Sequence, residues 1–319
     1  MILVTGATGF VGRRVVEMLS SRGFTVRALV RSGSKVPASV ERNARLVTGD
    51  IMDVETLRNA CEGVDCVVHL AAIIREHGNL TFNQINYGGT SNILRAASDT
   101  NVRRIVHAST IGVSYDPGTP YLYSRWMAEQ EVQQSPLAHT ILRFSVGFGE
   151  GDAFFNVLAA QIKISPLVFV VGKGATKFQP IAVEDIARCL VTAVEKGKRE
   201  EEWAGKVIEV GGPKHYTYDD VLDCIAEILG IKIAKVHVPT HLMQPAIKII
   251  ENIAPRPPVT TEQIKMLEID NITSRDSVQR EFGFEPSAFR DNLSYLQRIG
   301  LLDAIKIISG FMPERIRKY

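Results

Sequence analysis

Short apolar runs alternate with amphipathic stretches through the first part of the chain. Six apolar runs predict strands, which cover residues 2–5, 25–31, 44–50, 66–72, 103–110 and 139–145. The residues between them show helical spacing, as at Val15, Val16 and Leu19, and predict helices that include 54–63 and 85–100. Strands and helices that alternate at this interval predict an α/β fold, with a doubly wound parallel sheet covered on both faces.

The pattern becomes less regular after about residue 146. The elements predicted there are a loop or hairpin over 165–174, helices over 181–197 and 216–230, and a strand over 206–212. We therefore predict two domains. The larger comprises residues 1–145 and 177–204, and a smaller C-terminal α/β domain comprises residues 146–176 and 205–319.

A glycine-rich loop lies between the first predicted strand and the first predicted helix. Glycine permits a tight turn and lets the backbone approach a pyrophosphate, and the start of the following helix supplies free N–H groups and a partial positive charge. A plain glycine turn is the alternative, but this placement favours a dinucleotide site. The loop residues predicted to contact the cofactor are Gly6, Thr8, Gly9, Phe10, Val11 and Gly12.

The end of the second predicted strand indicates which nicotinamide cofactor is bound. A carboxylate about 20 residues past the glycine loop would accept a hydrogen bond from the ribose 2′-hydroxyl of NAD. The strand ends instead in Leu29, Val30 and Arg31, followed by Ser32 and Lys35. Because a guanidinium binds phosphate oxygens bidentately, we predict NADP(H) in preference to NAD(H). The alternative is that Arg31 stacks on the adenine or faces water.

Two further strand ends complete the predicted cofactor site. Asp50 could accept a hydrogen bond from the adenine amino group while Ile51 packs on the ring. The alternative is that Asp50 caps the next helix, a role that it could share with Asp53. The fourth strand ends in His69, which we expect to be structural. Small or apolar residues follow it and leave room for the cofactor: Leu70, Ala71 and Ala72.

Composition narrows the function classes further. The 319 residues are 45% hydrophobic and 23% charged, and the net charge of +2 is too small to indicate nucleic-acid binding. Four scattered cysteines without a CxxC or a histidine cluster predict neither a metal site nor a disulfide framework. No stretch approaches the roughly 18 apolar residues of a membrane span, and the initial MILVT lacks the basic start of a signal peptide. We expect a cytoplasmic protein, at most peripheral to the inner face of the membrane.

The chain contains the motifs TGATGFVG, GDIMD, HLAA, INYGGT, HASTIGV and LRFSVGFG. With these motifs, nearly the whole chain resembles the extended short-chain dehydrogenase/reductase superfamily, also called the NAD-dependent epimerase/dehydratase superfamily. The runs GEGDAFFN, KFQPIAVEDIA and PRPPVTTEQIKMLEIDN resemble one atypical branch. That branch contains the nucleotide-binding accessory subunit of respiratory complex I and its bacterial relatives. The resemblance implies a Rossmann fold and a bound dinucleotide. Members of the branch are generally regarded as cofactor binders with degraded active sites.

The resemblance also implies a catalytic set, carried over residue by residue. The hydroxyl residue after the fifth strand corresponds to Thr110, with Ser109 beside it. The run YSRWMAE aligns Tyr123 with the catalytic tyrosine, so that Met127 stands where the superfamily has lysine. The remaining cofactor contacts implied by the resemblance are Asn86, Phe144, Ser145 and Val146.

Met127 changes the functional expectation. A lysine would favour the ionised form of a neighbouring tyrosine and bind the nicotinamide ribose, whereas methionine supplies neither a charge nor a donor. We therefore hypothesise structural or regulatory nucleotide binding, linked to a respiratory or quinone-related assembly. One alternative is that Tyr121 and Arg125, about 200 degrees around the helix from Tyr123, face the cofactor instead. Another is an active oxidoreductase, epimerase or dehydratase acting on a nucleotide sugar or an isoprenoid-like substrate.

The C-terminal tail is both apolar and basic. Its apolar residues are Ile305, Ile307, Ile308, Phe311 and Met312, and its cations include Arg315, Arg317 and Lys318. Such a tail could rest on an anionic membrane surface or on a respiratory-complex partner. Residues 241–255 are similar in character. The alternative is that both segments pack on the second domain and that the last charges are solvated.

Overall fold

The computed structural model describes residues 1–199, 201–253, 257 and 259–317. Of the segments considered above, residues 254–256, 258 and 318 lie outside this described part of the chain. The chain divides into two compact units. Unit 1 comprises Met1–Phe144, Val183–Val210 and Arg280–Gly283, and unit 2 comprises Ser145–Ala182, Gly211–Gln279 and Phe284–Tyr319.

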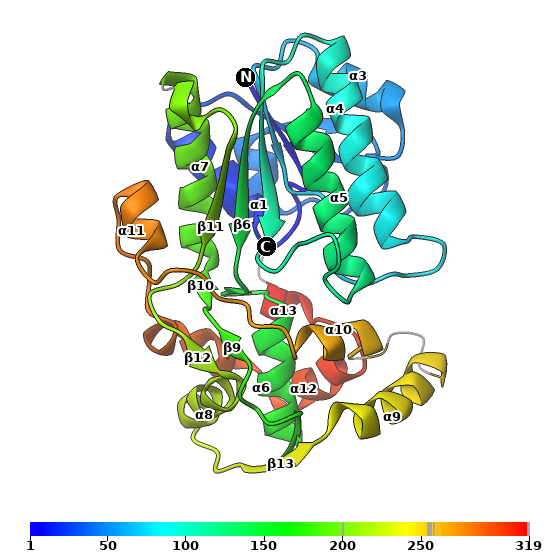
Figure 1. Cartoon of the computed structure of the whole chain (residues 1–319), viewed down its shortest axis with the longest axis vertical. Helices are drawn as coiled ribbons and strands as arrows, with labels where there is room; N and C mark the ends of the chain where they lie inside the picture. The colour runs from blue at the N-terminus through cyan, green and yellow to red at the C-terminus, as the bar shows by residue number, and fades with distance from the viewer. Residues whose placement is uncertain (200, 254–256, 258, 318–319) are drawn as a thin grey trace. The chain divides into compact units, whose positions relative to one another are not determined.

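The centre of unit 1 is a parallel sheet, which within the described residues contains seven strands in the order β11-β6-β5-β4-β1-β2-β3 (Figure 1). The strands are β1 (Ile2–Thr5), β2 (Val26–Val30), β3 (Arg45–Thr48), β4 (Cys66–His69), β5 (Arg104–Thr110), β6 (Ala138–Phe144) and β11 (Lys206–Val210). Every neighbouring pair is parallel. The predicted doubly wound α/β fold is therefore confirmed. The strand order reverses direction between β1 and β4, which is where such sheets bind ligands.

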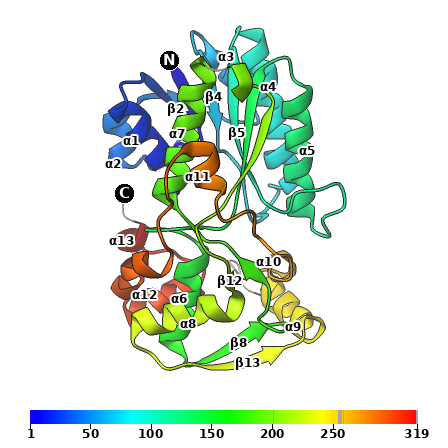
Figure 2. The same ribbon diagram turned by 60° about the vertical axis from the view of Figure 1, so that its left-hand side comes forward.

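Helices cover both faces of this sheet, as Figures 1 and 2 show. One face carries α1 (Gly12–Ser21), α2 (Ala38–Asn43) and α7 (Val183–Arg199). The other carries α3 (Val54–Cys61), α4 (Gly89–Asp99) and α5 (Pro120–Gln134), with a π-helical turn at Asn83–Gly88 before α4. A short 3-10 turn, Glu201–Trp203, follows α7. The side chains of Leu3, Leu57, Ile93, Ile105 and Ile141 are fully buried between the sheet and α3–α5.

Unit 2 is built around α6 (Phe154–Ile164). The helices α8 (Tyr218–Leu229) and α12 (Leu301–Ile308) pack against it. Its core is aromatic: the Phe289 ring lies 5.2 Å from the Phe148 ring and 4.8 Å from the Phe155 ring, between centroids. The other helices and 3-10 turns are α9 (Thr240–Ile253), α10 (Thr261–Met266), α13 (Glu314–Arg317), Arg290–Asn292 and Ser294–Arg298. The helix α11 (Ser277–Phe282) has residues in both units.

The strands of unit 2 form two-stranded pairs. They are β7 (Gly147–Phe148) with β10 (Ile181–Ala182), β9 (Lys177–Phe178) with β12 (Tyr216–Thr217), and β8 (Leu167–Val171) with β13 (Ala234–Val238). The predicted loop or hairpin over 165–174 is wrong, because β8 pairs in parallel with the distant β13 (Figure 2). No helix among the described residues is long and apolar enough to cross a membrane.

Candidate nucleotide site and tyrosine helix

The glycine loop makes a tight turn between β1 and α1. Gly6 has a φ of +67°, and a Cβ atom there would lie 2.9 Å from the backbone nitrogen of Ala71 at the end of β4. A Cβ atom at Gly12 would lie 2.1 Å from the carbonyl oxygen of Gly6. The Gly9 N–H donates to that same carbonyl at 3.0 Å. Side chains at these positions would therefore force the loop away from the end of β4.

The start of α1 is suited to an anion. No described side chain forms a cap hydrogen bond at this helix terminus. The Arg13 and Arg14 N–H groups donate to the Gly9 and Val11 carbonyls at 3.2 and 3.1 Å, so backbone donors for a ligand would come from the residues before Arg13. The loop before α1 contains three half-buried residues, which are Thr8, Phe10 and Val11. After β4, Leu70 and Ala71 are also half-buried, whereas Ala72 is exposed. The structure thus brings the loop residues and the end of β4 to one place, where a pyrophosphate would meet backbone donors.

A buried hydrogen-bond network joins β1 to β4 below this loop. The Thr5 hydroxyl lies 2.7 Å from His69 Nδ1, and it accepts hydrogen bonds from the Leu70 and Ala71 N–H groups at 3.2 and 3.3 Å. On the other side of the ring, His69 Nε2 lies 3.1 Å from the hydroxyl of Thr90. Burial lowers the pKa of His69 to about 3, so the imidazole is neutral and serves to position the strand ends.

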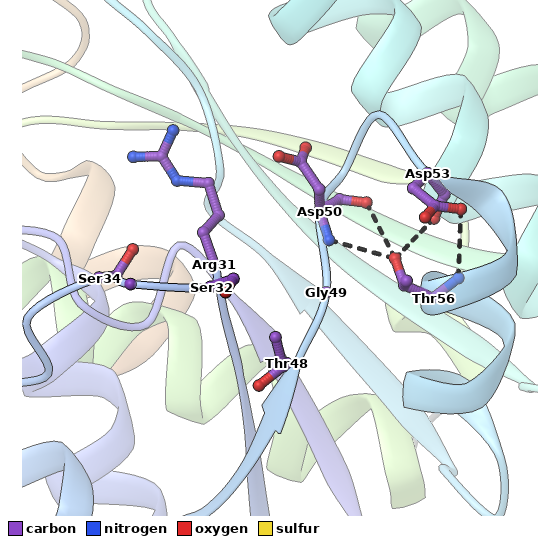
Figure 3. A pocket seen from close by; sticks show the side chains of 9 residues that line it. Arg31, Ser32, Ser34, Thr48, Gly49, Asp50, Asp53 and Thr56 are labelled. Atoms are coloured by element: carbon purple, nitrogen blue, oxygen red, sulfur yellow. Dashed lines mark hydrogen bonds between the residues drawn. The ribbon is translucent and has the colours of Figure 1, made fainter.

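A polar pocket of about 460 Å³ lies at the ends of β2 and β3 (Figure 3). Its lining residues are Arg31, Ser32, Gly33, Ser34, Thr48, Gly49, Asp50, Asp53 and Thr56. The Arg31 side chain is exposed and extends beside the pocket from the end of β2. The pocket thus contains a guanidinium and two serine hydroxyls, together with the carboxylates of Asp50 and Asp53.

The two aspartates of this pocket make different hydrogen bonds. Asp53 caps α3 and accepts from the N–H groups of Glu55 and Thr56 at 3.0 and 3.4 Å. Asp50 accepts from the Met52 N–H at 2.9 Å, within its own loop. The cap thus falls to Asp53, while the Asp50 carboxylate lines the pocket (Figure 3). Ile51 packs partly into the core beside α4, where its Cδ1 would lie 2.7 Å from a Cβ at Gly89.

The tyrosine helix α5 turns Tyr121 and Arg125 inward and Tyr123 outward. Thr119 caps the helix by accepting from the Leu122 N–H at 3.2 Å, and Pro120 occupies the first turn, so the phase of the helix is well fixed. Tyr121 is 8% exposed and Arg125 is 5% exposed, whereas Tyr123 is 39% exposed. The Tyr123 ring stacks on Trp126 at 5.8 Å between centroids.

The inward face of α5 meets other residues predicted for the site. Asn86 donates to the Ser124 hydroxyl and to the Ile73 carbonyl, each at 3.1 Å, and accepts from the Ile73 N–H at 2.8 Å. Arg125 donates to the carbonyl of Ala108 on β5. Burial raises the pKa of Tyr121, and the charge of Arg125 opposes that rise. Asn86 and the end of β5 are therefore brought together with Tyr121 and Arg125, and not with Tyr123.

The hydroxyl residues at the end of β5 differ in their partners. Ser109 is buried, and its hydroxyl has no hydrogen-bond partner among the described residues. The Thr110 hydroxyl donates to the Ile111 carbonyl at 3.4 Å. Phe144, at the end of the neighbouring strand, is buried.

Ser145 and Val146 belong to unit 2 and are engaged there. The Ser145 hydroxyl donates to the Gln179 carbonyl, and the Val146 N–H donates to Asn271 at 2.7 Å. They therefore stay predicted cofactor contacts only.

Sequence reasoning missed Ser124 and gave Arg125 a secondary place. The buried residues of α5 recur at spacings of three and four, and they are Tyr121, Leu122, Ser124, Arg125, Ala128, Glu129 and Val132. The sequence hides this periodicity, because Ser124, Arg125 and Glu129 on the buried face are polar and apolar residues lie on other sides of the helix.

Comparisons with known proteins agree with this geometry. Residues 2–211 match the NAD dependent epimerase/dehydratase family. The chain is 27% identical to sterol demethylase protein B of Methylococcus capsulatus, over 94% of this chain and 99% of that protein. It is 25% identical to the mitochondrial NADH dehydrogenase [ubiquinone] 1 alpha subcomplex subunit 9 of Arabidopsis thaliana, over 71% of this chain and 57% of that protein.

A solved structure, that of gox2253, is also similar. It is 29% identical in sequence, with a TM-score of 0.72, and the match covers 92% of this chain and 96% of that one. The matched family region contains the seven-stranded sheet, the glycine loop and the tyrosine helix described above. The chain therefore belongs to the NAD-dependent epimerase/dehydratase family.

Proposed function

We propose that the protein is an NADP(H)-dependent oxidoreductase whose acid/base pair is Tyr121 with Arg125. The observation that carries this proposal is the inward orientation of both side chains on α5, one helical turn apart, while Tyr123 is exposed. Burial raises the pKa of Tyr121 and Arg125 limits that rise, so the phenol keeps its proton and would act as the proton donor in ketone reduction. When bound, the nicotinamide would supply the hydride.

The physical role of Arg125 follows from its charge and its anchoring. A tyrosine in water has a pKa near 10, and a cation within roughly 4–6 Å favours the phenolate. A guanidinium remains protonated in proteins, so this influence does not fade at alkaline pH as that of a lysine does. The bond from Arg125 to the Ala108 carbonyl holds the charge at the end of β5. Met127 does not remove the cation in this arrangement, because it belongs to the outward-facing pair.

The preference for NADP(H) is the second part of the proposal. Arg31, Ser32 and Ser34 line the polar pocket, and no acidic residue lies between Ala28 and Lys35 in the sequence. Charge-assisted hydrogen bonds to a phosphate contribute about 1.5–3 kcal/mol, which corresponds to roughly 10- to 150-fold in affinity. Arg31→Ala should therefore weaken NADPH binding by about that factor in a fluorescence titration and leave NADH binding nearly unchanged. Arg42→Ala, an exposed arginine on α2 outside the pocket, is the matched control.

The acid/base assignment is tested by two tyrosine variants. The substrates to screen are ketones and alcohols of the sterol or isoprenoid class and nucleotide sugars, followed through NADPH absorbance. Tyr121→Phe should abolish turnover and retain NADPH binding. Tyr123→Phe should leave turnover within a factor of about two, because its ring is exposed and stacked on Trp126. The reverse result would refute the assignment.

A second candidate function is structural or regulatory nucleotide binding in a respiratory or quinone-related assembly. The similarity to a subunit of mitochondrial NADH dehydrogenase favours it. A binder of this kind would copurify with its nucleotide, exchange it slowly, and turn over no member of the panel. Mass spectrometry of the copurified nucleotide, combined with an exchange-rate measurement, separates the two candidates.

A further inference from the structure

The outer face of α12 in unit 2 is apolar. The α12 patch consists of Leu301, Leu302 and Ile305 on the helix and of Phe311 just after it. Leu302 is 75% exposed, more than any other large apolar side chain in the described part of the chain. Single exposed leucines are ordinary, but several on one short helix are not.

The inner face of α12 anchors the helix to unit 2. It supplies Ala304 and Ile307, which are buried in the core beside α6. A surface helix normally has polar residues on its solvent side. Leu301, Leu302 and Ile305 depart from that pattern, because they are 61%, 75% and 49% exposed.

Hydrogen bonds fix the α12 patch in place. At the start of the helix, Asp303 accepts from the Gly300 N–H at 2.8 Å. At its end, Gly310 has a φ of +82° and donates to the Ile307 carbonyl at 3.0 Å, and the Phe311 N–H donates to the Lys306 carbonyl at 2.8 Å. This pair of bonds is a Schellman motif, which holds Phe311 against the end of the helix. The patch is therefore preorganised.

Cations precede and follow the α12 patch along the chain. Lys306 is exposed and follows Ile305 directly, and the side chains of Arg298 and Arg315 are 54% and 63% exposed. Arg298 pairs with Glu150, and Arg315 pairs with Asp303. Between residues 298 and 317 the sequence has four cations (Arg298, Lys306, Arg315, Arg317) and two anions (Asp303, Glu314), a net charge of 4 − 2 = +2.

We propose that the α12 patch docks the protein on an anionic lipid surface. Leu301, Leu302, Ile305 and Phe311 enter the boundary between headgroups and acyl chains, while Lys306 and its neighbouring arginines face the lipid phosphates. Four side chains fall short of the ~800 Å² that each partner of a stable protein complex contributes, whereas a lipid surface accepts a small apolar patch. This inference is independent of the catalytic assignment above.

The test is cosedimentation of the full chain with vesicles. Binding should occur to vesicles of phosphatidylcholine mixed with phosphatidylserine, weaken with phosphatidylcholine alone, and fall as salt rises. Leu301→Ser combined with Leu302→Ser should lower partitioning by tenfold or more, since each leucine loses its apolar contact. Lys306→Glu should lower it several-fold.

The matched control is the double variant Leu46→Ser with Leu80→Ser in unit 1, because both leucines are 40% exposed and lie outside residues 241–255 and the α12 patch. It should leave partitioning unchanged, and all variants should retain the wild-type circular dichroism spectrum and urea midpoint as evidence that they are folded. Absence of binding to the anionic vesicles overturns the proposal. Equal losses of vesicle binding in the control and the α12 variant also overturn the proposal. A dimer in solution that disappears on mutation of the α12 patch overturns it as well, because the occupant would then be a second copy of the chain.

Discussion

Asp152 is a buried carboxylate whose protonation should control the stability of unit 2. It lies at the start of α6, where Oδ1 accepts from the N–H groups of Phe155 and Asn156 at 2.7 and 3.2 Å. Its Oδ2 accepts from the Tyr295 hydroxyl at 2.6 Å and from the side-chain amide of Asn156 at 3.1 Å. Burial raises the pKa of Asp152 from 3.8 to about 6, and these donors only partly offset that rise.

The sign of the effect follows from proton binding in the two states. Between pH 3.8 and about 6 the folded chain keeps the proton on Asp152 and the unfolded chain has lost it. The free energy of unfolding must therefore fall as the pH rises through this window, and level off above it. A pKa difference of about 2 units corresponds to about 3 kcal/mol, of which about 2 kcal/mol is lost between roughly pH 4.5 and 7.

The assay is urea denaturation of the wild type and of Asp152→Asn across this pH range. The amide does not titrate, so the difference between the two free energies of unfolding isolates Asp152 from all other groups. Wild type minus variant should decrease by about 2 kcal/mol from pH 4.5 to 7. A difference that stays flat or increases with pH would refute the reasoning, because it would mean that the four donors outweigh desolvation and that the carboxylate is charged in the fold.

Three further changes test the loop, the buried ion pair and the aromatic core. Gly12→Ala should abolish NADPH binding in a fluorescence titration, because its Cβ would lie 2.1 Å from the Gly6 carbonyl oxygen. The comparison is Gly23→Ala, which adds backbone strain at a φ of +82° but meets no atom within 4 Å, and which should retain binding. Glu129→Ala should lower the free energy of unfolding by about 3 kcal/mol, since it leaves the Arg143 guanidinium without its bidentate partner, and Glu129→Gln should cost less. Phe289→Ala should cost about 3–5 kcal/mol in the same measurement, because three aromatic rings pack around it.

The sequence was sufficient for the central strands of the unit 1 sheet, because these are buried on both faces. Such strands are continuous apolar runs, and β1, β2 and β4 are buried at every residue. The strand β11 was predicted, but as part of the smaller domain, whereas it belongs to this sheet. The strand β8 was not recognised, because its run LVFVV has exposed residues at Leu167 and Phe169 and pairs with a strand far along the chain. An apolar run therefore predicts a strand best when that strand lies in the centre of a sheet and is buried on both faces.

The glycine loop was predictable for a different reason. Gly6 needs a positive φ and Gly12 needs the absence of a Cβ, so the residue type itself reports the backbone geometry. No residue type indicates in the same way which side of α5 faces the sheet. Apolar residues lie on several sides of this helix, and only the tertiary contacts of Asn86 with Ser124 and of Arg125 with Ala108 reveal which side faces the sheet.

The inner face of α5 and the outer face of α12 are opposite departures from the usual burial pattern. Burying Arg125 costs several kcal/mol unless hydrogen bonds compensate, yet its Nε atom has no partner within the described residues. Exposing Leu301 and Leu302 forgoes about 1.5–3 kcal/mol for each side chain that burial would have provided. The stability of its own unit explains neither the buried Arg125 nor the exposed Leu301 and Leu302. Such departures from the usual burial pattern are expected at functional sites. A buried cation with an unpartnered Nε suits a polar ligand, which supports the acid/base role proposed for Arg125, and exposed leucines next to a lysine suit the proposed lipid surface. The two proposals start from different observations, and each can fail without the other.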